Sequence, residues 1–371
     1  MNDGEHGWQQ RLKRQDRYFK EGQGHFLIIG AYAEGGPEQT RKHPIEGQID
    51  TLLSEEFLSK HAYDLGIQTA LWAAHDLAVH EQVDDDALPC HAIDFGVGST
   101  ASLFTGGEVH FEEYTSYSLD TFVKTWDDID RLKFDPDNRW VRYDLDFWRG
   151  FSSAYTPGLA VSPHFFRSPL DLANDLRGNQ IFIDMYDEPE QVDRLVTVCT
   201  DMIIDAVDFL RQEIPLLREA PSGIWGMASS SPDIVVVNGD PVDLISVEMG
   251  QRFDRPHIER LCREAGPVFF HHHTLGVSRV TSVAKMEGIF VQNFIYDSKC
   301  PKVLDIVDDE WIAASGRAPI EVCQDLTEAK DLDAVLAKMA QGRFIVHCYG
   351  KTSDECNDLI ARVRSYDSQA V

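Results

Sequence analysis

The sequence has little positive charge: its 371 residues include 34 Lys and Arg against 62 Asp and Glu, a formal net charge of −28. Without a basic block, the chain lacks the electrostatic footprint needed to bind nucleic acid or an anionic membrane surface. No apolar run approaches the length of a membrane span, and residues 1–16 are polar where a secretory signal needs an apolar core. These absences predict a cytoplasmic protein that binds neither nucleic acid nor membrane.

Paired cysteines and nucleotide-binding motifs are also lacking. The seven cysteines are odd in number and widely spaced, in a chain too long to need disulfide staples, so we expect free thiols. Residues 95–99 are glycine-rich but lack the third glycine and distal acid of a dinucleotide fingerprint. This incomplete fingerprint disfavours a nicotinamide cofactor. The sequence also has no P-loop, no G-x-S-x-G and no H-E-x-x-H.

Short apolar runs alternate with amphipathic helices from about residue 158 onward, which is typical of a parallel sheet wound by crossover helices. Helices are expected over 57–79 and from an Asp187 N-cap. Together with one earlier run, eight runs read as strands: 26–32, 159–166, 224–228, 234–237, 267–273, 289–294, 320–323 and 344–348.

Eight strands are the number that closes a (β/α)8 TIM barrel. The predicted fold class is therefore α/β, with one barrel domain over 25–371 and an N-terminal extension over 1–24. A doubly wound open sheet is the alternative. No internal repeat or linker divides the chain.

Active-site groups of such barrels lie at the carboxyl ends of the strands. The run 267–273 ends in three histidines, and strand alternation points His271 and His273 to one face and His272 to the other. Cys348 ends the last run. Two imidazoles and a thiolate with one open position form a catalytic zinc set. The alternative is a polar strand end and a buried core thiol.

Three further side chains at strand ends are catalytic candidates. Asp240 follows the run 234–237, where it could act as a general base or orient a metal-bound group. The sequence N-G-D-P is equally ordinary for a turn. His164 and Arg167 end the run 159–166, where Arg167 could clamp a carboxylate or form a surface ion pair.

Three segments carry a family resemblance. Residues 168–192 resemble a helix and the following capped helix of the uroporphyrinogen decarboxylase superfamily. Residues 240–256 are similar to a strand, turn and helix of that superfamily, and residues 95–116 to a stretch of its bacterial members. The likeness covers residues 95 to 365 and implies a (β/α)8 barrel, in agreement with the strand count.

One branch of this superfamily comprises zinc-dependent corrinoid methyltransferases. Residues 270–274 (FHHHT) resemble their Leu-His-x-Cys-Gly motif, with His273 in place of the cysteine, and Cys348 falls where their distal cysteine would lie. The resemblance implies zinc on His271, His273 and Cys348, a small-molecule methyl acceptor, and a corrinoid donor on a separate partner protein. It is compatible with a homodimer.

The decarboxylase branch grips its substrate with an arginine-rich motif, and both arginines are missing from residues 29–34 here. The sequence therefore favours a methyltransferase. The alternatives are a metal-independent decarboxylase, using Asp240 and Arg167, and a barrel that binds a small ligand without catalysis.

Overall fold

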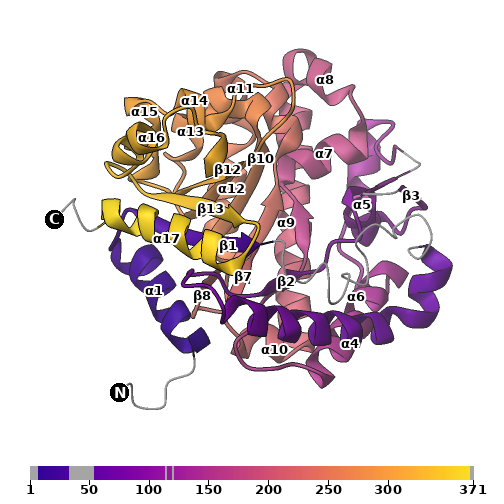
Figure 1. Cartoon of the computed structure of the whole chain (residues 1–371). Coiled ribbons are helices and arrows are strands. Elements are labelled where there is room, and N and C mark those ends of the chain that lie inside the picture. Colours follow the sequence, from indigo (N-terminus) through magenta and orange to yellow (C-terminus); the bar gives the residue numbers. More distant parts are fainter. Residues whose placement is uncertain (1–6, 33–53, 113–114, 119–120, 368–371) are drawn as a thin grey trace.

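A computed structural model describes residues 7–32, 54–112, 115–118 and 121–367 (Figure 1). Of the segment 29–34, residues 33 and 34 thus lie outside the described residues. Helices surround a central sheet, and α1 and α17, near the two ends of the chain, lie on the same side of it (Figure 1). In the described residues, no helix combines the length and apolar character needed to cross a membrane.

The central sheet has seven parallel strands, which supports the predicted α/β class and a TIM-barrel-like architecture. In spatial order they are β1 (Phe26–Tyr32), β13 (Phe344–Gly350), β12 (Ile320–Asp325), β11 (Ile289–Ile295), β10 (Val268–His273), β9 (Val235–Asn238) and β6 (Phe165–Arg167). Next to β6 along the chain, β5 (Ala160–Ser162) pairs in parallel with β2 (Cys90–Ala92).

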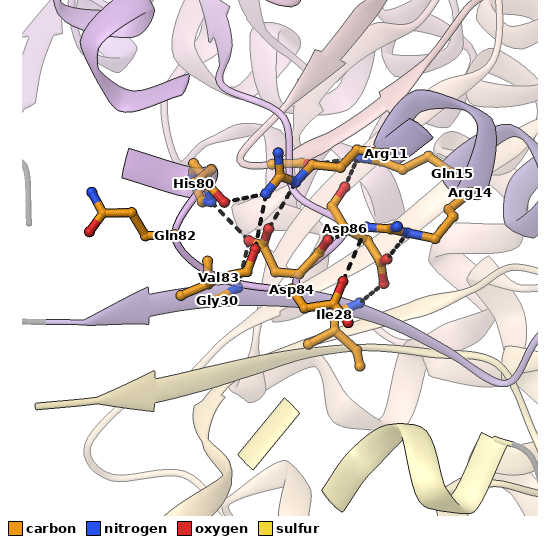
Figure 2. A network of polar contacts seen from close by, with 12 residues as sticks. Arg11, Arg14, Gln15, Ile28, Gly30, His80, Gln82, Val83, Asp84 and Asp86 are labelled. Carbon is orange, nitrogen blue, oxygen red and sulfur yellow. Dashed lines mark hydrogen bonds and ion pairs between the residues drawn. The ribbon is translucent and has the colours of Figure 1, made fainter. Parts of the chain in front are cut away.

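Two aspartate side chains and one backbone amide, rather than a paired strand, contact the edge of β1. Over the described residues, no strand pairing joins β1 to β2 and closes the ring. The Asp86 side chain accepts a hydrogen bond from the Ile28 amide at 2.9 Å (Figure 2). Asp85 accepts one from the Gly30 amide at 3.0 Å. These carboxylates satisfy backbone donors that an open sheet edge would leave unpaired.

Arginines of α1 (Gly7–Glu21) hold these two carboxylates in place. Arg14 pairs with Asp86 at 2.7 Å (Figure 2). Arg11 pairs with Asp85 at 3.2 Å. The segment predicted as an N-terminal extension therefore carries a helix that is tied to the edge of the sheet.

The inner face of the sheet is apolar toward the amino-terminal ends of its strands. Its cluster combines alternate residues of five strands with two residues of a hairpin: Leu27, Ile29, Val236, Phe269, Val291, Ile345, Ile224 and Met227. The hairpin consists of β7 (Ser222–Ile224) and β8 (Met227–Ser229), with Trp225 and Gly226 at positive φ in its turn. The run 224–228 is thus wrong as a strand of the main sheet, while β2 lies in a segment without a clear strand pattern.

The helices bury apolar residues against the sheet or against one another. Apart from α1 they are α4 (Glu55–His80), α5 (Val97–Thr105), α6 (Arg139–Ser153), α7 (Pro169–Arg177), α8 (Ile181–Asp187), α9 (Pro189–Glu213), α10 (Leu216–Glu219), α11 (Val247–Phe253), α12 (Arg255–Glu264), α13 (Val280–Val283), α14 (Val303–Ile306), α15 (Asp309–Ser315), α16 (Leu332–Met339) and α17 (Ser353–Asp367). A separate hairpin is formed by β3 (Val109–Glu112) and β4 (Thr115–Ser118).

The helix predicted over 57–79 is confirmed as α4. The predicted Asp187 N-cap is wrong: Asp187 ends α8, and α9 begins at Pro189 with Glu188 at its N-cap.

Candidate functional site

Polar side chains occupy the inner face of the sheet at the carboxyl ends of its strands. His271 on β10 is in register with Asn293 on β11, which is in register with Glu321 on β12. Aligned residues of neighbouring parallel strands point to the same side of a sheet. Two groups of three potential metal ligands follow from this arrangement: Asp240, His271 and His273 in one, and Glu321, Cys323 and His347 in the other, with the ligand atoms of each group within 4.8 Å of one another.

The first group combines two neighbouring strands. The Nε2 atom of His273 lies 3.3 Å from Asp240 Oδ1, and the Nε2 atom of His271 lies 3.8 Å from the same oxygen. Asp240 begins a short 3-10 helix directly after β9, and its backbone amide donates to Asn238 Oδ1 at 3.0 Å. The turn chemistry expected for N-G-D-P is thus what places the carboxylate opposite the two rings.

The other nitrogen of each ring is anchored. His271 Nδ1 contacts Asn293 Oδ1, and His273 Nδ1 contacts Asp297 Oδ1 at 3.0 Å. An Nδ1–H that donates to oxygen leaves Nε2 as the lone-pair nitrogen, which is how metal-binding imidazoles are usually oriented. Both lone pairs then face Asp240.

The first group fits a divalent cation on two further observations. Asp240 Oδ1 is buried and has no hydrogen-bond partner among the described residues, although it lies beside both Nε2 atoms. Burial lowers the pKa of His271 to about 4, against the opposing effects of Asp240 and Asn293, so the ring is neutral and able to ligate near pH 7. A cation between these three groups would satisfy the orphaned oxygen.

His272 faces the other side of β10, as strand alternation predicts. Its ring packs on Phe294 with centroids 3.8 Å apart, and its Nδ1 lies 3.3 Å from Asp243 Oδ1. The second oxygen of Asp243 accepts a hydrogen bond from the His273 amide at 3.0 Å. His272 and Asp243 thereby fix the strand end that carries His271 and His273.

Cys348 is not brought together with the two histidines. It is fully buried in the apolar cluster between β13 and α17, where Cys356 donates to its carbonyl oxygen at 3.2 Å. Burial raises the pKa of its thiol. The inward positions of β13 are instead Ile345, which belongs to the inner cluster, and two residues further His347. The structure therefore does not bring the predicted Cys348 to His271 and His273, and the side chain that lies beside the two rings is Asp240.

The second group combines β12 and β13 and was not predicted. His347 Nε2 lies 2.8 Å from Glu321 Oε1 and 3.9 Å from Cys323 Sγ. Asn293 Nδ2 donates to Cys323 Sγ at 3.0 Å and also contacts Glu321 Oε2. Burial, followed by the charge of Glu321, raises the pKa of the Cys323 thiol well above its ordinary value. Asn293 therefore links the two groups, because its carbonyl oxygen faces His271.

The structure places His164 away from both groups. Its Nδ1 lies 3.0 Å from Asp144 on α6, and its Nε2 lies 3.1 Å from Thr100 on α5. These are the atom types of a nucleophile–histidine–acid triad. All three side chains are buried, however, at 1 to 2% exposure, so no substrate reaches the hydroxyl. The contacts of His164 join the sheet to two helices.

Arg167 ends β6 and is taken up by ion pairs. Its guanidinium forms a two-point contact with Asp175, at 2.8 and 3.2 Å, and lies 3.7 Å from Asp171. Arg167 is 6% exposed. The alternative of an ion pair is thus what the structure contains, although the pair is buried rather than on the surface.

Comparison with known proteins gives a fold relative and no family. No family model matches the sequence, and no curated protein matches it. The structure is similar to a methyltransferase from Methanosarcina mazei, with a TM-score of 0.59 over 96% of this chain and 98% of that chain. The two sequences are 12% identical, so the likeness concerns the fold.

Proposed function

We propose that the protein is a methyltransferase that holds one zinc ion with His271, His273 and Asp240. The observation that supports this most directly is the convergence of two anchored imidazoles on one carboxylate oxygen, for which the described part of the chain offers no hydrogen-bond partner. The site lies at the carboxyl ends of β9 and β10, the end of the strands at which TIM-barrel enzymes carry their active sites. The methyltransferase name of the structural neighbour supports the reaction class at a coarse level.

Three protein ligands leave one coordination position of zinc open, where a bound thiol or water has a lowered pKa and is a nucleophile near neutral pH. Other side chains of the protein orient the two histidine ligands and surround them. Asn293 and Asp297 fix the two rings, as metal ligands need outer partners to hold their orientation. Trp225 and Phe165 meet the His271 ring edge-on, with centroids 5.4 and 5.7 Å away, and shield its side from water.

The methyl acceptor in this proposal is a small molecule that enters the open position. The methyl donor is a corrinoid carried by a separate protein, since the chain has no Asp-x-His-x-x-Gly signature for binding one itself. Both assignments rest on the resemblance to the corrinoid methyltransferases. Aligning donor and acceptor at one site would add to the rate by removing translational and rotational freedom.

The test measures zinc and methyl transfer together. Metal-stripped protein is titrated with zinc, and methylcobalamin with a small thiol serves as the probe for transfer. We expect His271→Ala and Asp240→Asn each to lose one equivalent of zinc and the transfer activity. His61→Ala, which removes a half-exposed imidazole on α4, is the matched control and keeps both. Unchanged zinc content in folded His271→Ala protein would refute the site, and activity that survives chelation would refute the mechanism.

The decarboxylase alternative has less support in the structure. It needs Arg167 to bind a substrate carboxylate, whereas this guanidinium is already paired with Asp175 and Asp171. If the protein released carbon dioxide from a carboxylated substrate after a chelator had removed its metal, that result would favour the decarboxylase alternative over methyl transfer.

A further inference from the structure

We propose that the chain binds a second, thiophilic divalent cation through Glu321, Cys323 and His347. These residues lie on β12 and β13, whereas the ligands of the first group lie on β10 and directly after β9. They offer oxygen, sulfur and nitrogen, a donor set that suits zinc better than magnesium or calcium. Three protein ligands leave one position open for water or a small ligand.

One of the two measured distances lies in the range expected for a shared ion, and the other, a hydrogen-bond contact, is slightly shorter. Zinc bonds are about 2.0 to 2.3 Å long in tetrahedral sites, so two ligand atoms of one ion lie roughly 3 to 4 Å apart. His347 Nε2 lies 2.8 Å from Glu321 Oε1 and 3.9 Å from Cys323 Sγ. The three donor atoms therefore need small adjustments to enclose a cation.

The carboxylate of Glu321 supplies the second argument. The residue is fully buried, and within the described part of the chain it forms an ion pair with no Lys or Arg side chain. Its contacts among the described residues are the His347 ring, the amide of Asn293 and the Cys323 thiol, and none of these carries a fixed positive charge. A buried carboxylate is costly unless a positive charge or several hydrogen bonds compensate it. A cation held between Glu321, Cys323 and His347 would provide that charge.

The same contacts indicate where each proton goes when the cation binds. Binding converts the Cys323 thiol to a thiolate and releases its proton to solvent. The His347 ring gives Nε2 to the cation and keeps its proton on Nδ1, which lies 3.4 Å from the Tyr349 hydroxyl oxygen. Asn293 Nδ2 can continue to donate to the sulfur, which would stabilise the thiolate.

Sulfur distinguishes the two sites experimentally, because only the second contains a cysteine. Metal-stripped whole protein is titrated with Co²⁺, whose bond to a thiolate gives a charge-transfer absorption in the near ultraviolet. We expect two equivalents of Co²⁺ in the wild type, with the thiolate band. Cys323→Ser should lose the band and one equivalent, while His271→Ala should lose one equivalent and keep the band.

Matched controls keep the result interpretable. Cys300→Ser changes a partly exposed thiol and should leave the band unchanged. If Cys323→Ser does not fold, as judged by circular dichroism, Glu321→Gln tests the same site while retaining a hydrogen-bonding side chain. No thiolate band in the folded wild type, or a band that persists in folded Cys323→Ser, would overturn the second site. Absence of the thiolate band in the wild type would contradict only the second site, and it would not contradict the first site or the proposed methyl transfer.

Discussion

Cys348 and His347 are neighbours on β13, but replacing Cys348 should lower the stability and leave the zinc content unchanged, whereas replacing His347 should lower the zinc content. Cys348→Ala removes one buried sulfur atom from the packing between β13 and α17. Loss of a group the size of a methylene from the core costs about 0.8 kcal/mol. A residual void of about 25 Å³, at about 24 cal/mol per Å³, adds about 0.6 kcal/mol. We therefore expect a loss of about 1.4 kcal/mol in the free energy of unfolding.

For a chain of 371 residues, the entropy of unfolding is about 0.8 kcal/mol per kelvin, so the melting temperature should fall by about 2 °C. Differential scanning calorimetry measures this shift, and metal analysis of the same samples measures zinc. Cys348→Ala should keep its full zinc content, whereas His347→Ala should lose one equivalent. Zinc lost from folded Cys348→Ala protein, with a melting temperature close to the wild type, would refute the assignment of Cys348 to the core.

Two other perturbations test the surroundings of the site. Arg167→Met leaves the buried carboxylates of Asp171 and Asp175 without their cation, and denaturant unfolding at pH 7 should show a loss of about 3 to 5 kcal/mol with unchanged zinc content; lost zinc with normal stability would contradict this. Burial raises the pKa of Asp254 to about 7, partly opposed by Arg279, so the folded state binds more protons than the unfolded state between about pH 4 and pH 7. The free energy of unfolding should consequently fall across this range by up to about 4 kcal/mol, and Asp254→Asn should remove that component; a difference between variant and wild type that does not change with pH would disprove the interpretation.

Local sequence patterns determined most of the strands and the relation of side chains within each strand. The runs that became β1 and β9 to β13 were recognisable as apolar segments bounded by turns or charge. Alternation alone placed His271 and His273 on one face and His272 on the other, as the structure has them. The N-G-D-P turn located Asp240 at a strand end, because turn chemistry is also local.

Which face of a strand turns inward was decided only by the tertiary structure. In the run FIVHCYG, Phe344, Val346 and Cys348 alternate with Ile345 and His347, and both sets are suited to burial. A parallel strand is covered on both faces, so its hydrophobic pattern does not reveal its phase. Packing against α17 assigned Cys348 to the outer side and His347 to the inner side.

Contacts between segments that are distant in the sequence also depended on the tertiary structure. Glu321 and Cys323 join His347 because β12 pairs with β13, a neighbour relation that no local pattern contains. Residues 224–228 were predicted as a strand of the main sheet because their apolar pattern resembles that of a buried strand. They belong instead to hairpin β7–β8, which packs into the inner cluster. The sequence by itself determined most strands of the main sheet and their order along the chain, since these follow from short-range periodicity. The tertiary structure selected which polar ends converge, since register and packing are long-range properties.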